Sequence, residues 1–381
     1  MERAGNCGLL GEKLGHSRSP EIHRLFGDYS YRLFEKPPEE VRDFLLGGDF
    51  DAINVTIPYK RTAFELCDEL TPEAERFGNV NVVVCRGGKL FGDNTDGYGF
   101  KALVDSTGVD VRGLKCTVLG GGGAAATARR ALEDAGAAQV VTVSRRGEDN
   151  YGNLGRHADT AVLVNATPVG MFPDVGSAPV SLDAFPCCRA VVDLIYNPSP
   201  TVLLAEAERR GMPAAGGLLM LVAQAWKASE YFGRRRTGNI YLYGPPGCGK
   251  STFGKSLAPV LEMDFVDLDA EIAAAEKMTI PEIFAVRGEK GFRTAEKEAL
   301  RRVSGLNGKV VALGGGALLD PESRRLAEST GGVLMLDCTL EALIARALRS
   351  GGRPLLAGDI ESRLRKLMSE RCEHYRSFSR V

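Results

Sequence analysis

Histidine, tryptophan and long apolar runs are all scarce in this sequence. Four histidines among 381 residues argue against a histidine-rich metal centre. No stretch approaches the roughly 20 apolar residues of a membrane-spanning helix, and residues 1–5 do not begin a signal peptide. The nine cysteines lack the paired spacing of zinc sites. We therefore expect a cytoplasmic protein without a membrane partner.

An excess of charge of one sign is also missing. The chain has 48 basic and 49 acidic residues, so no electrostatic attraction to nucleic acid is expected. Hydrophobic residues make up 44% of the sequence, enough for sizeable cores. At roughly 150 residues per domain, the length indicates two or three folding units.

A phosphate-binding loop is present at residues 244–251, GPPGCGKS, which matches G-x-x-x-x-G-K-[ST] at every fixed position. An apolar run precedes it and a helix-like segment follows, as the motif requires. Its glycines let backbone N–H groups surround phosphate oxygens, while Lys250 adds a charge and Ser251 a hydroxyl for Mg²⁺. The predicted contacts are Gly244, Gly247, Cys248, Gly249, Lys250, Ser251 and Thr252. A turn that binds nothing is the weaker alternative.

Two serines near the start of the chain indicate a second type of site. Ser19 precedes Pro20, which predicts Ser19 as a helix N-cap with proline at the first helical position. Ser17 has no such structural role. Two hydroxyls beside a helix N-terminus would suit a carboxylate ligand.

Amide and carboxylate side chains follow in the same region. Residues 50–58 alternate at the strand period, with Asn54 and Thr56 on the polar face and Lys60 just beyond. The opposite face of this predicted strand carries Ile53, Val55 and Ile57. Asn81 and the segment Asn94-Thr95-Asp96-Gly97 share the same chemistry. A solvated strand face and a simple turn are the structural alternatives.

Together these residues closely resemble the substrate domain of shikimate dehydrogenases. The resemblance implies that Ser17 and Ser19 hold the substrate carboxylate and that Lys60 and Asp96 are the catalytic pair. It also implies that the ring hydroxyls are bound by Asn54, Thr56, Asn81 and Asp96. A lysine beside a carboxylate is held charged and oriented, as a proton donor to a ketone oxygen must be.

A dinucleotide signal lies in the middle of the chain. Residues 115–119 form a buried-type strand that leads into four glycines and a helix. The next strand ends in Ser144-Arg145-Arg146, where an NAD-binding domain usually has an acidic residue, so arginine favours the 2′-phosphate of NADP. A solvated basic loop is the alternative. The predicted NADP contacts are Gly120, Gly122, Gly123, Ala124, Ser144, Arg145, Arg146, Thr167 and Met171.

The dehydrogenase resemblance extends into this middle region. It implies that Thr167 and Met171 lie near the nicotinamide and that Gln224, on a later helix, reaches the substrate. The segment Ser144-Arg145-Arg146 departs from the more usual Asn-Arg-Thr, which keeps the arginine and changes its neighbours.

An ordered set of fragments beyond the phosphate loop is similar to shikimate kinases. The fragments are FVDLD at 265–269, GEKGFRTAE at 288–296, LGGG at 313–316, RPLL at 353–356 and RCEHY at 371–375. The first is expected to place Asp267 and Asp269 on one face of a strand end, although two aspartates there could merely cap a helix. The family usually continues with another strand and helix; if the domain is truncated here, the kinase sheet lacks an edge strand.

This second resemblance also assigns roles. It gives Lys250 and Ser251 to ATP and Mg²⁺, with Lys250 also catalytic, Asp267 to the metal, and Arg353 to a catalytic lid. Its shikimate-binding residues are Asp269, Arg293, Gly315, Gly316 and Arg371. Arginine suits both tasks because it binds carboxylates bidentately and neutralises a phosphoryl group in transfer.

The predicted fold is α/β throughout, a two-lobed dehydrogenase followed by a P-loop kinase. The expected shikimate-binding lobe covers residues 1–106 and is completed by a helix at about 214–232. A Rossmann lobe for NADP is expected at 107–213, a linker at 233–239 and the kinase at 240–381.

The two resemblances together predict a bifunctional enzyme. It would reduce 3-dehydroshikimate to shikimate with NADPH and then phosphorylate shikimate to shikimate 3-phosphate with ATP and Mg²⁺. Two alternatives remain open: quinate as a further substrate of the first site, and a non-catalytic metabolite sensor built on the same domains.

Overall fold

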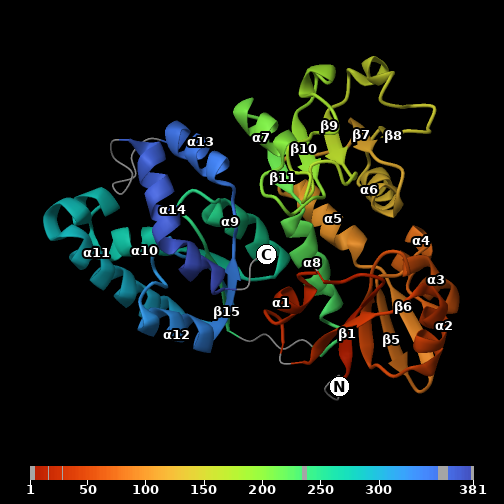
Figure 1. The fold of residues 1–381 in the computed structure, drawn as a ribbon, viewed down its shortest axis with the longest axis horizontal. Helices are drawn as coiled ribbons and strands as arrows, with labels where there is room; N and C mark the ends of the chain where they lie inside the picture. Colours follow the sequence, from red (N-terminus) through yellow and green to blue (C-terminus); the bar gives the residue numbers. More distant parts are fainter. Residues whose placement is uncertain (1–4, 16, 28, 234–237, 351–358, 379–381) are drawn as a thin grey trace. The chain divides into compact units, whose positions relative to one another are not determined.

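The protein is described from a computed structural model that covers residues 5–15, 17–27, 29–233, 238–350 and 359–378. The chain divides into two compact units, Met1–Arg235 and Arg236–Val381 (Figure 1). The predicted linker falls partly outside the described residues, because 234–237 are not among them. Within the described residues, no helix is both long and apolar enough to cross a membrane.

The first sheet of the first unit is mixed. Its strand order is β2-β1-β3-β5-β6-β4, with parallel pairs at β1–β2 and β1–β3 and antiparallel pairs at β3–β5 and β5–β6. The strands are β1 (Cys7–Gly11), β2 (Tyr31–Glu35), β3 (Ala52–Val55), β4 (Glu69–Leu70), β5 (Val82–Arg86) and β6 (Lys89–Asp93). The helices of this lobe are α1 (Ser19–His23), α2 (Pro38–Gly47), α3 (Lys60–Leu66), α4 (Pro72–Phe77) and α5 (Asp96–Asp105). Buried Leu10, Leu45 and Ile53 lie at the centre of its core.

The strand expected at residues 50–58 is shorter than predicted. It ends at Val55, because a turn follows in which the Tyr59 N–H donates to the Thr56 carbonyl at 2.9 Å. Ile57 is therefore not on a buried strand face and is 75% exposed. The turn places Lys60 at the first position of α3.

The second sheet of this unit has the order β11-β10-β9-β7-β8, and its described pairs are all parallel. The strands are β7 (Lys115–Leu119), β8 (Gln139–Val143), β9 (Val162–Asn165), β10 (Ala190–Asp193) and β11 (Ala214–Gly216). They alternate with α6 (Gly123–Asp134), η1 (Leu154–His157), η2 (Leu182–Ala184) and α7 (Val202–Arg209). A parallel sheet with helical crossovers is the arrangement of nucleotide-binding folds.

Two helices lie between the sheets of this unit, α5 and α8 (Leu218–Ala228) (Figure 1). They approach closely at Gly99, where an added Cβ would lie 2.6 Å from the Met220 carbonyl oxygen. Arg76 of α4 also pairs with Asp134 of α6. These contacts fix the two lobes against each other, so side chains from both can meet at one site.

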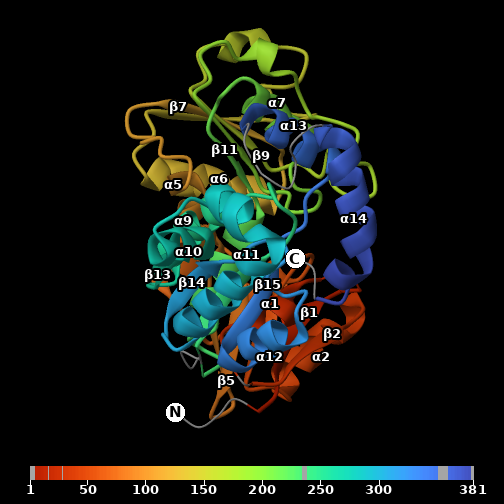
Figure 2. The ribbon, with the colours of Figure 1, turned by 90° about the vertical axis from the view of Figure 1, so that its left-hand side faces the viewer.

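The second unit is built on a parallel sheet of four described strands in the order β13-β14-β12-β15. The strands are β12 (Asn239–Tyr243), β13 (Asp264–Asp267), β14 (Lys309–Ala312) and β15 (Gly331–Met335). The helices are α9 (Lys250–Val260), α10 (Leu268–Glu276), α11 (Ile280–Ser304), α12 (Pro321–Thr330), α13 (Leu340–Ser350) and α14 (Ile360–Arg376). Figure 2 shows β13 and α14 at opposite sides of this unit.

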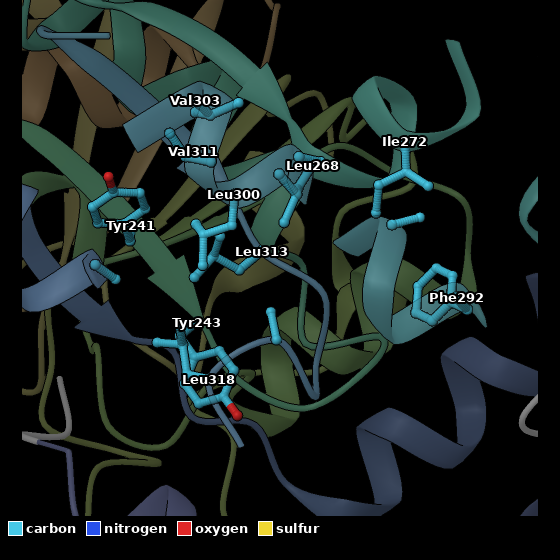
Figure 3. Close-up of a cluster of buried hydrophobic side chains, with 14 of the residues drawn as sticks. Tyr241, Tyr243, Leu268, Ile272, Phe292, Leu300, Val303, Val311, Leu313 and Leu318 are labelled. Atoms are coloured by element: carbon cyan, nitrogen blue, oxygen red, sulfur yellow. The ribbon is translucent and has the colours of Figure 1, made fainter. Parts of the chain in front are cut away.

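The core of the second unit contains two tyrosines from its central strand (Figure 3). Tyr241 and Tyr243 are fully buried with their hydroxyls satisfied: Tyr241 donates to Ser304 Oγ at 3.0 Å, and Tyr243 lies 3.0 Å from His374 Nε2. Leu268, Leu300 and other apolar side chains surround them. The predicted α/β class is thus confirmed in both units.

Two candidate active sites

The predicted catalytic pair of the first unit is formed. Lys60 begins α3 and Asp96 begins α5, and Lys60 Nζ lies 2.5 Å from Asp96 Oδ2. Their side chains are 27% and 12% exposed, so the ion pair is only partly accessible to solvent. The N-terminus of α5 also favours a carboxylate at this position.

Asn81 holds the other oxygen of this carboxylate. Its Nδ2 donates to Asp96 Oδ1 at 2.9 Å and reaches Gln224 Oε1, on α8, at 3.4 Å. Its Oδ1 accepts from the Thr95 N–H at 2.8 Å, and Asn94 Oδ1 accepts from the Asp96 N–H at 2.9 Å. Asp96 is therefore oriented before any substrate arrives.

Asn54 is connected to the same network. Its Nδ2 donates to the Asn81 carbonyl at 3.2 Å, and its Oδ1 accepts from the Tyr31 hydroxyl at 2.7 Å. Thr56 follows the end of the same strand and is half-buried. Tyr31 is a residue that the sequence did not single out, because no local pattern links it to Asn54.

Ser17 and Ser19 lie together at the start of α1. Ser19 was expected as the N-cap of this helix, but the structure instead begins the helix at Ser19, after Arg18 as N-cap. The Ser17 hydroxyl donates to Ser19 Oγ at 3.2 Å and accepts from the Ser19 N–H at 3.3 Å. Both side chains are half-buried. They therefore present paired hydroxyls, the arrangement proposed for a carboxylate.

Tyr196, from the second lobe, faces this helix. Burial raises the pKa of the Tyr196 phenol, while the Arg18 guanidinium opposes the shift and the Glu21 carboxylate adds to it. These charges act on Tyr196 only because α1 lies near it. The available sequence signal was the tyrosine just after the buried strand β10.

The predicted NADP residues gather around the start of α6. Gly120 has φ +122, and an added Cβ there would lie 2.9 Å from the Ala166 carbonyl oxygen. At Gly122 and Gly123 an added Cβ would meet nothing within 4 Å, which leaves the helix N-terminus open. Ala124 lies in the first turn of the same helix. An open helix N-terminus fits a pyrophosphate.

The second group of predicted NADP residues follows the neighbouring strands. An added Cβ at Gly121 would lie 3.3 Å from Ser144 Cβ, so the turn after β8 adjoins the glycine turn. Arg145 and Arg146 in that turn are exposed. After β9, the Thr167 hydroxyl donates to Asn165 Oδ1 at 2.7 Å, and Met171 is 45% exposed.

The phosphate-binding loop of the second unit has the backbone that its glycines allow. Gly244, Gly247 and Gly249 have φ values of +145, +90 and +98, which residues with side chains rarely adopt. Lys250 Nζ donates to the Gly244 and Pro245 carbonyls at 2.8 and 2.9 Å. Cys248 and Thr252 flank this lysine and Ser251. The cradle fits a polyphosphate.

Ser251 and Asp267 meet beside this loop. The Ser251 hydroxyl donates to Asp267 Oδ2 at 2.5 Å, a pairing that fits a shared Mg²⁺. Asp267 is also the N-cap of α10, where its side chain accepts from the Asp269 N–H at 3.1 Å. Asp269 therefore lies in the helix and not on the strand face where it was expected. The alternative that an aspartate here caps the following helix is thus confirmed for Asp267.

Arg293 is held by two carboxylates. Its Nη1 lies 2.6 Å from Glu296 Oε2 and its Nη2 3.2 Å from Glu289 Oε1. Burial raises the pKa of Glu296, and the Arg293 guanidinium opposes that shift. An added Cβ at Gly316 would lie 2.8 Å from Arg293 Nη2, so the glycine segment passes directly against the arginine.

The Gly315 carbonyl accepts from α14. Arg371 Nη1 donates to it at 3.2 Å and the Tyr375 hydroxyl at 2.7 Å. An added Cβ at the adjacent Gly314 would lie 3.7 Å from Asp269 Oδ1, so the predicted shikimate residues lie around one glycine segment. Tyr375 was not predicted as a functional residue. Arg353 lies outside the described residues.

Comparison with known proteins agrees with this division. The family model "Shikimate dehydrogenase substrate binding domain" matches residues 9–83, and the model "Shikimate kinase" matches residues 246–381. The chain is 37% identical over 244 residues to the shikimate dehydrogenase (NADP(+)) of Clostridium perfringens, which covers 58% of this chain and 90% of that protein.

Solved structures resemble the first unit. A chorismate mutase/shikimate 5-dehydrogenase fusion protein from Clostridium acetobutylicum matches with a TM-score of 0.57 and 35% identity, covering 60% of this chain and 91% of that one. Shikimate 5-dehydrogenase from Thermus thermophilus, solved in complex with NADP(H) and shikimate, matches with a TM-score of 0.55 and 32% identity, covering 60% and 94%.

Proposed function

Because this chain belongs to the shikimate dehydrogenase family, we propose that the Lys60–Asp96 pair is the catalytic centre of its first site. The chain is bifunctional, an NADP-dependent shikimate dehydrogenase followed by a shikimate kinase. It reduces 3-dehydroshikimate to shikimate and phosphorylates shikimate with ATP and Mg²⁺. The predicted activities and cofactors are thus confirmed, and the sensor alternative is not favoured.

In the first site, Lys60 is the proton donor for ketone reduction. NADPH, when bound, supplies the hydride. The Lys60 ammonium donates its proton to the carbonyl oxygen, and Asp96 keeps that ammonium oriented through the 2.5 Å contact. Ser17 and Ser19 hold the substrate carboxylate. The ring hydroxyls are bound by Asn54, Thr56, Asn81, Asp96 and Gln224.

The NADP contacts follow the same logic. The open N-terminus of α6 holds the pyrophosphate, and Arg145 binds the 2′-phosphate that distinguishes NADP from NAD. Ser144 and Arg146 complete the turn around the adenosine. Thr167 and Met171 lie beside the nicotinamide.

In the second site, the phosphate-binding loop and Lys250 hold the ATP phosphates, while Ser251 and Asp267 hold Mg²⁺. ATP, when bound, supplies the phosphoryl group. Asp269 binds the ring hydroxyl side of shikimate and Arg293 its carboxylate, supported by Gly315, Gly316 and Arg371. Arg353 is assigned to the lid on sequence grounds alone. We further propose a cytoplasmic location, on the short apolar runs and the cysteine spacing, and no nucleic-acid partner, on the balanced charge.

The observation that carries the proposal is the preformed Lys60–Asp96–Asn81 network within reach of Gln224. Its test is shikimate oxidation with NADP⁺ by Lys60→Ala and by Lys60→Arg, which keeps the charge but not a donor of low enough pKa. Both variants should lose most activity while Lys36→Ala, a surface lysine paired with Glu40, should not. Full activity in Lys60→Ala would remove Lys60 from the mechanism.

A further inference from the structure

Tyr31 reaches across a strand to the substrate-binding network. It is the first residue of β2 and lies opposite Cys7 of β1, while Asn54 of β3 lies opposite Leu9. Cys7 and Leu9 share one face of β1, so the Tyr31 ring crosses β1 on that face. Its hydroxyl then donates to Asn54 Oδ1 at 2.7 Å.

Aromatic packing holds the Tyr31 ring in this position. The imidazole of His23 stacks on it with ring centres 4.1 Å apart and planes at 15°, and Phe232 packs edge-on at 5.9 Å. Burial raises the pKa of the Tyr31 phenol well above its usual value, with the Ser19 hydroxyl opposing the shift. The phenol therefore stays protonated and remains a hydrogen-bond donor at any working pH.

The contacts of the Asn54 carboxamide determine which of its N–H groups can reach a ligand. Its Oδ1 accepts from Tyr31, and one Nδ2 hydrogen goes to the Asn81 carbonyl. The His23 imidazole, which stacks on the Tyr31 ring, also interacts with the Asn54 side chain. A carboxamide has two Nδ2 hydrogens, and within the described part of the chain the Asn81 carbonyl accepts one of them, which leaves the second for a ligand. Without Tyr31 the carboxamide could turn over, because the terminal torsion of asparagine is broad and roughly two-fold.

We infer that Tyr31 is a positioning residue of the dehydrogenase site, which fixes the Asn54 carboxamide so that its remaining N–H donates to a ring hydroxyl of the substrate. The inference rests on the proposed substrate-binding role of Asn54. Within the aromatic cluster of His23, Tyr29, Tyr31 and Phe232, the Tyr31 hydroxyl is thereby linked to the catalytic pair, through Asn54, Asn81 and Asp96 in sequence.

The test compares KM for shikimate in wild type and Tyr31→Phe, which removes only the hydroxyl. One lost hydrogen bond corresponds to a rise of roughly two- to tenfold, with KM for NADP⁺ unchanged. The matched control is Tyr29→Phe, which removes the hydroxyl that contacts His23 Nδ1 at 2.8 Å in the same cluster and should leave KM for shikimate unchanged. An unchanged KM for NADP⁺ verifies that the first unit, Met1–Arg235, is intact in each variant.

A double-mutant comparison separates positioning from general packing. If Tyr31 acts through Asn54, Tyr31→Phe should raise KM in the wild-type background and have no further effect in Asn54→Ala. Equal effects in both backgrounds, or an unchanged KM in an active Tyr31→Phe enzyme, would overturn the inference alone. Failure of the wild-type chain to oxidise shikimate would overturn the proposed function and the inference with it.

Discussion

The two sites of this chain differ in how their charged side chains are paired. In the dehydrogenase site, Asp96 is bonded to Lys60 and Asn81, and each of these contacts is one that the proposed reaction uses. In the kinase site, Lys250 is bonded to the carbonyls of its own loop, and Arg293 to Glu289 and Glu296. In the first site, the proposed catalytic side chains already contact one another. In the second, the positive charges of Lys250 and Arg293 are paired with groups of the protein itself.

The pairing of Lys250 with loop carbonyls matches the charge of the ligand proposed for it. A ring that bears one carboxylate can bind to the existing network of the first site with little rearrangement. Preorganisation of that network lowers the free-energy cost of binding. A triphosphate with Mg²⁺ carries enough charge to replace the carbonyl partners of Lys250. We therefore expect single substitutions to act locally in the first site and to expose unpaired charges in the second.

The largest expected effect is the separation of the two activities. Lys60→Ala removes the proposed proton donor and should reduce 3-dehydroshikimate reduction by about 10²–10⁴-fold, with phosphorylation near wild type. Lys250→Ala should do the reverse, because the ammonium near the β- and γ-phosphates is lost. Steady-state rates of both reactions on each purified variant provide the measurement. Equal loss of both activities in a folded variant would mean that the sites are not independent.

Arg293→Ala should weaken shikimate binding in the kinase site, where Arg293 is paired with Glu289 and Glu296. Loss of a charged contact to the shikimate carboxylate is worth about 3 kcal/mol, or roughly a hundredfold in KM for shikimate, with a much smaller change for ATP. Equal increases in both KM values would indicate general disruption of the fold instead.

The stability of Arg293→Ala should also depend on pH more strongly than that of the wild type. Burial raises the pKa of Glu296, and removing Arg293 takes away the group that opposes the shift. A glutamate with a raised folded pKa binds more protons folded than unfolded, so stability should fall as pH rises above about 4. Urea titrations across pH measure this slope. The double variant Arg293→Ala/Glu296→Gln should lack the extra slope, and its persistence would remove Glu296 as the cause.

Arg145→Ala tests the cofactor choice of the preassembled site. One charge-assisted hydrogen bond is worth about 1.5–3 kcal/mol, so affinity for NADP⁺ should fall roughly ten- to a hundredfold, with NAD⁺ affinity little changed. Arg129→Ala, on α6 and paired with Glu133, is the matched control. Unchanged NADP⁺ affinity in titrations of Arg145→Ala would end the assignment of this arginine to the 2′-phosphate.

Tyr375→Phe should give the smallest effect. The Tyr375 hydroxyl donates to the Gly315 carbonyl at 2.7 Å, and Arg371 still holds that carbonyl when the hydroxyl is gone. The loss of about 1 kcal/mol should raise KM for shikimate in the kinase assay by roughly fivefold and leave KM for ATP unchanged. An effect on ATP of the same size would place Tyr375 outside the shikimate side of the site.

Sequence patterns predicted what lies within one short stretch of chain. The phosphate-binding loop is a contiguous motif, and its strand and helix follow from the adjoining residues. The glycine turn before α6 and the arginines after β8 could be predicted because each is also a contiguous stretch of sequence. The fold class could therefore be predicted from local motifs, and both activities from the family resemblances that the ordered motifs carry.

What was missed depends on where elements end and on contacts between distant residues. Ile57 was expected on a strand, but the turn at Thr56 and Tyr59 ends β3 first. Asp269 was expected beside Asp267, yet Asp267 caps a helix that begins at the next residue. Tyr375 lies 60 residues from its partner Gly315. No periodicity carries such tertiary contacts.

The most direct test of two complete sites in one chain is a single incubation of the wild-type protein with 3-dehydroshikimate, NADPH and MgATP. Shikimate 3-phosphate should accumulate, with one NADP⁺ and one ADP formed for each molecule, as measured by mass spectrometry of the products. Shikimate that accumulates beside unconsumed ATP, or NADPH that is not oxidised, would contradict a chain that carries both reactions.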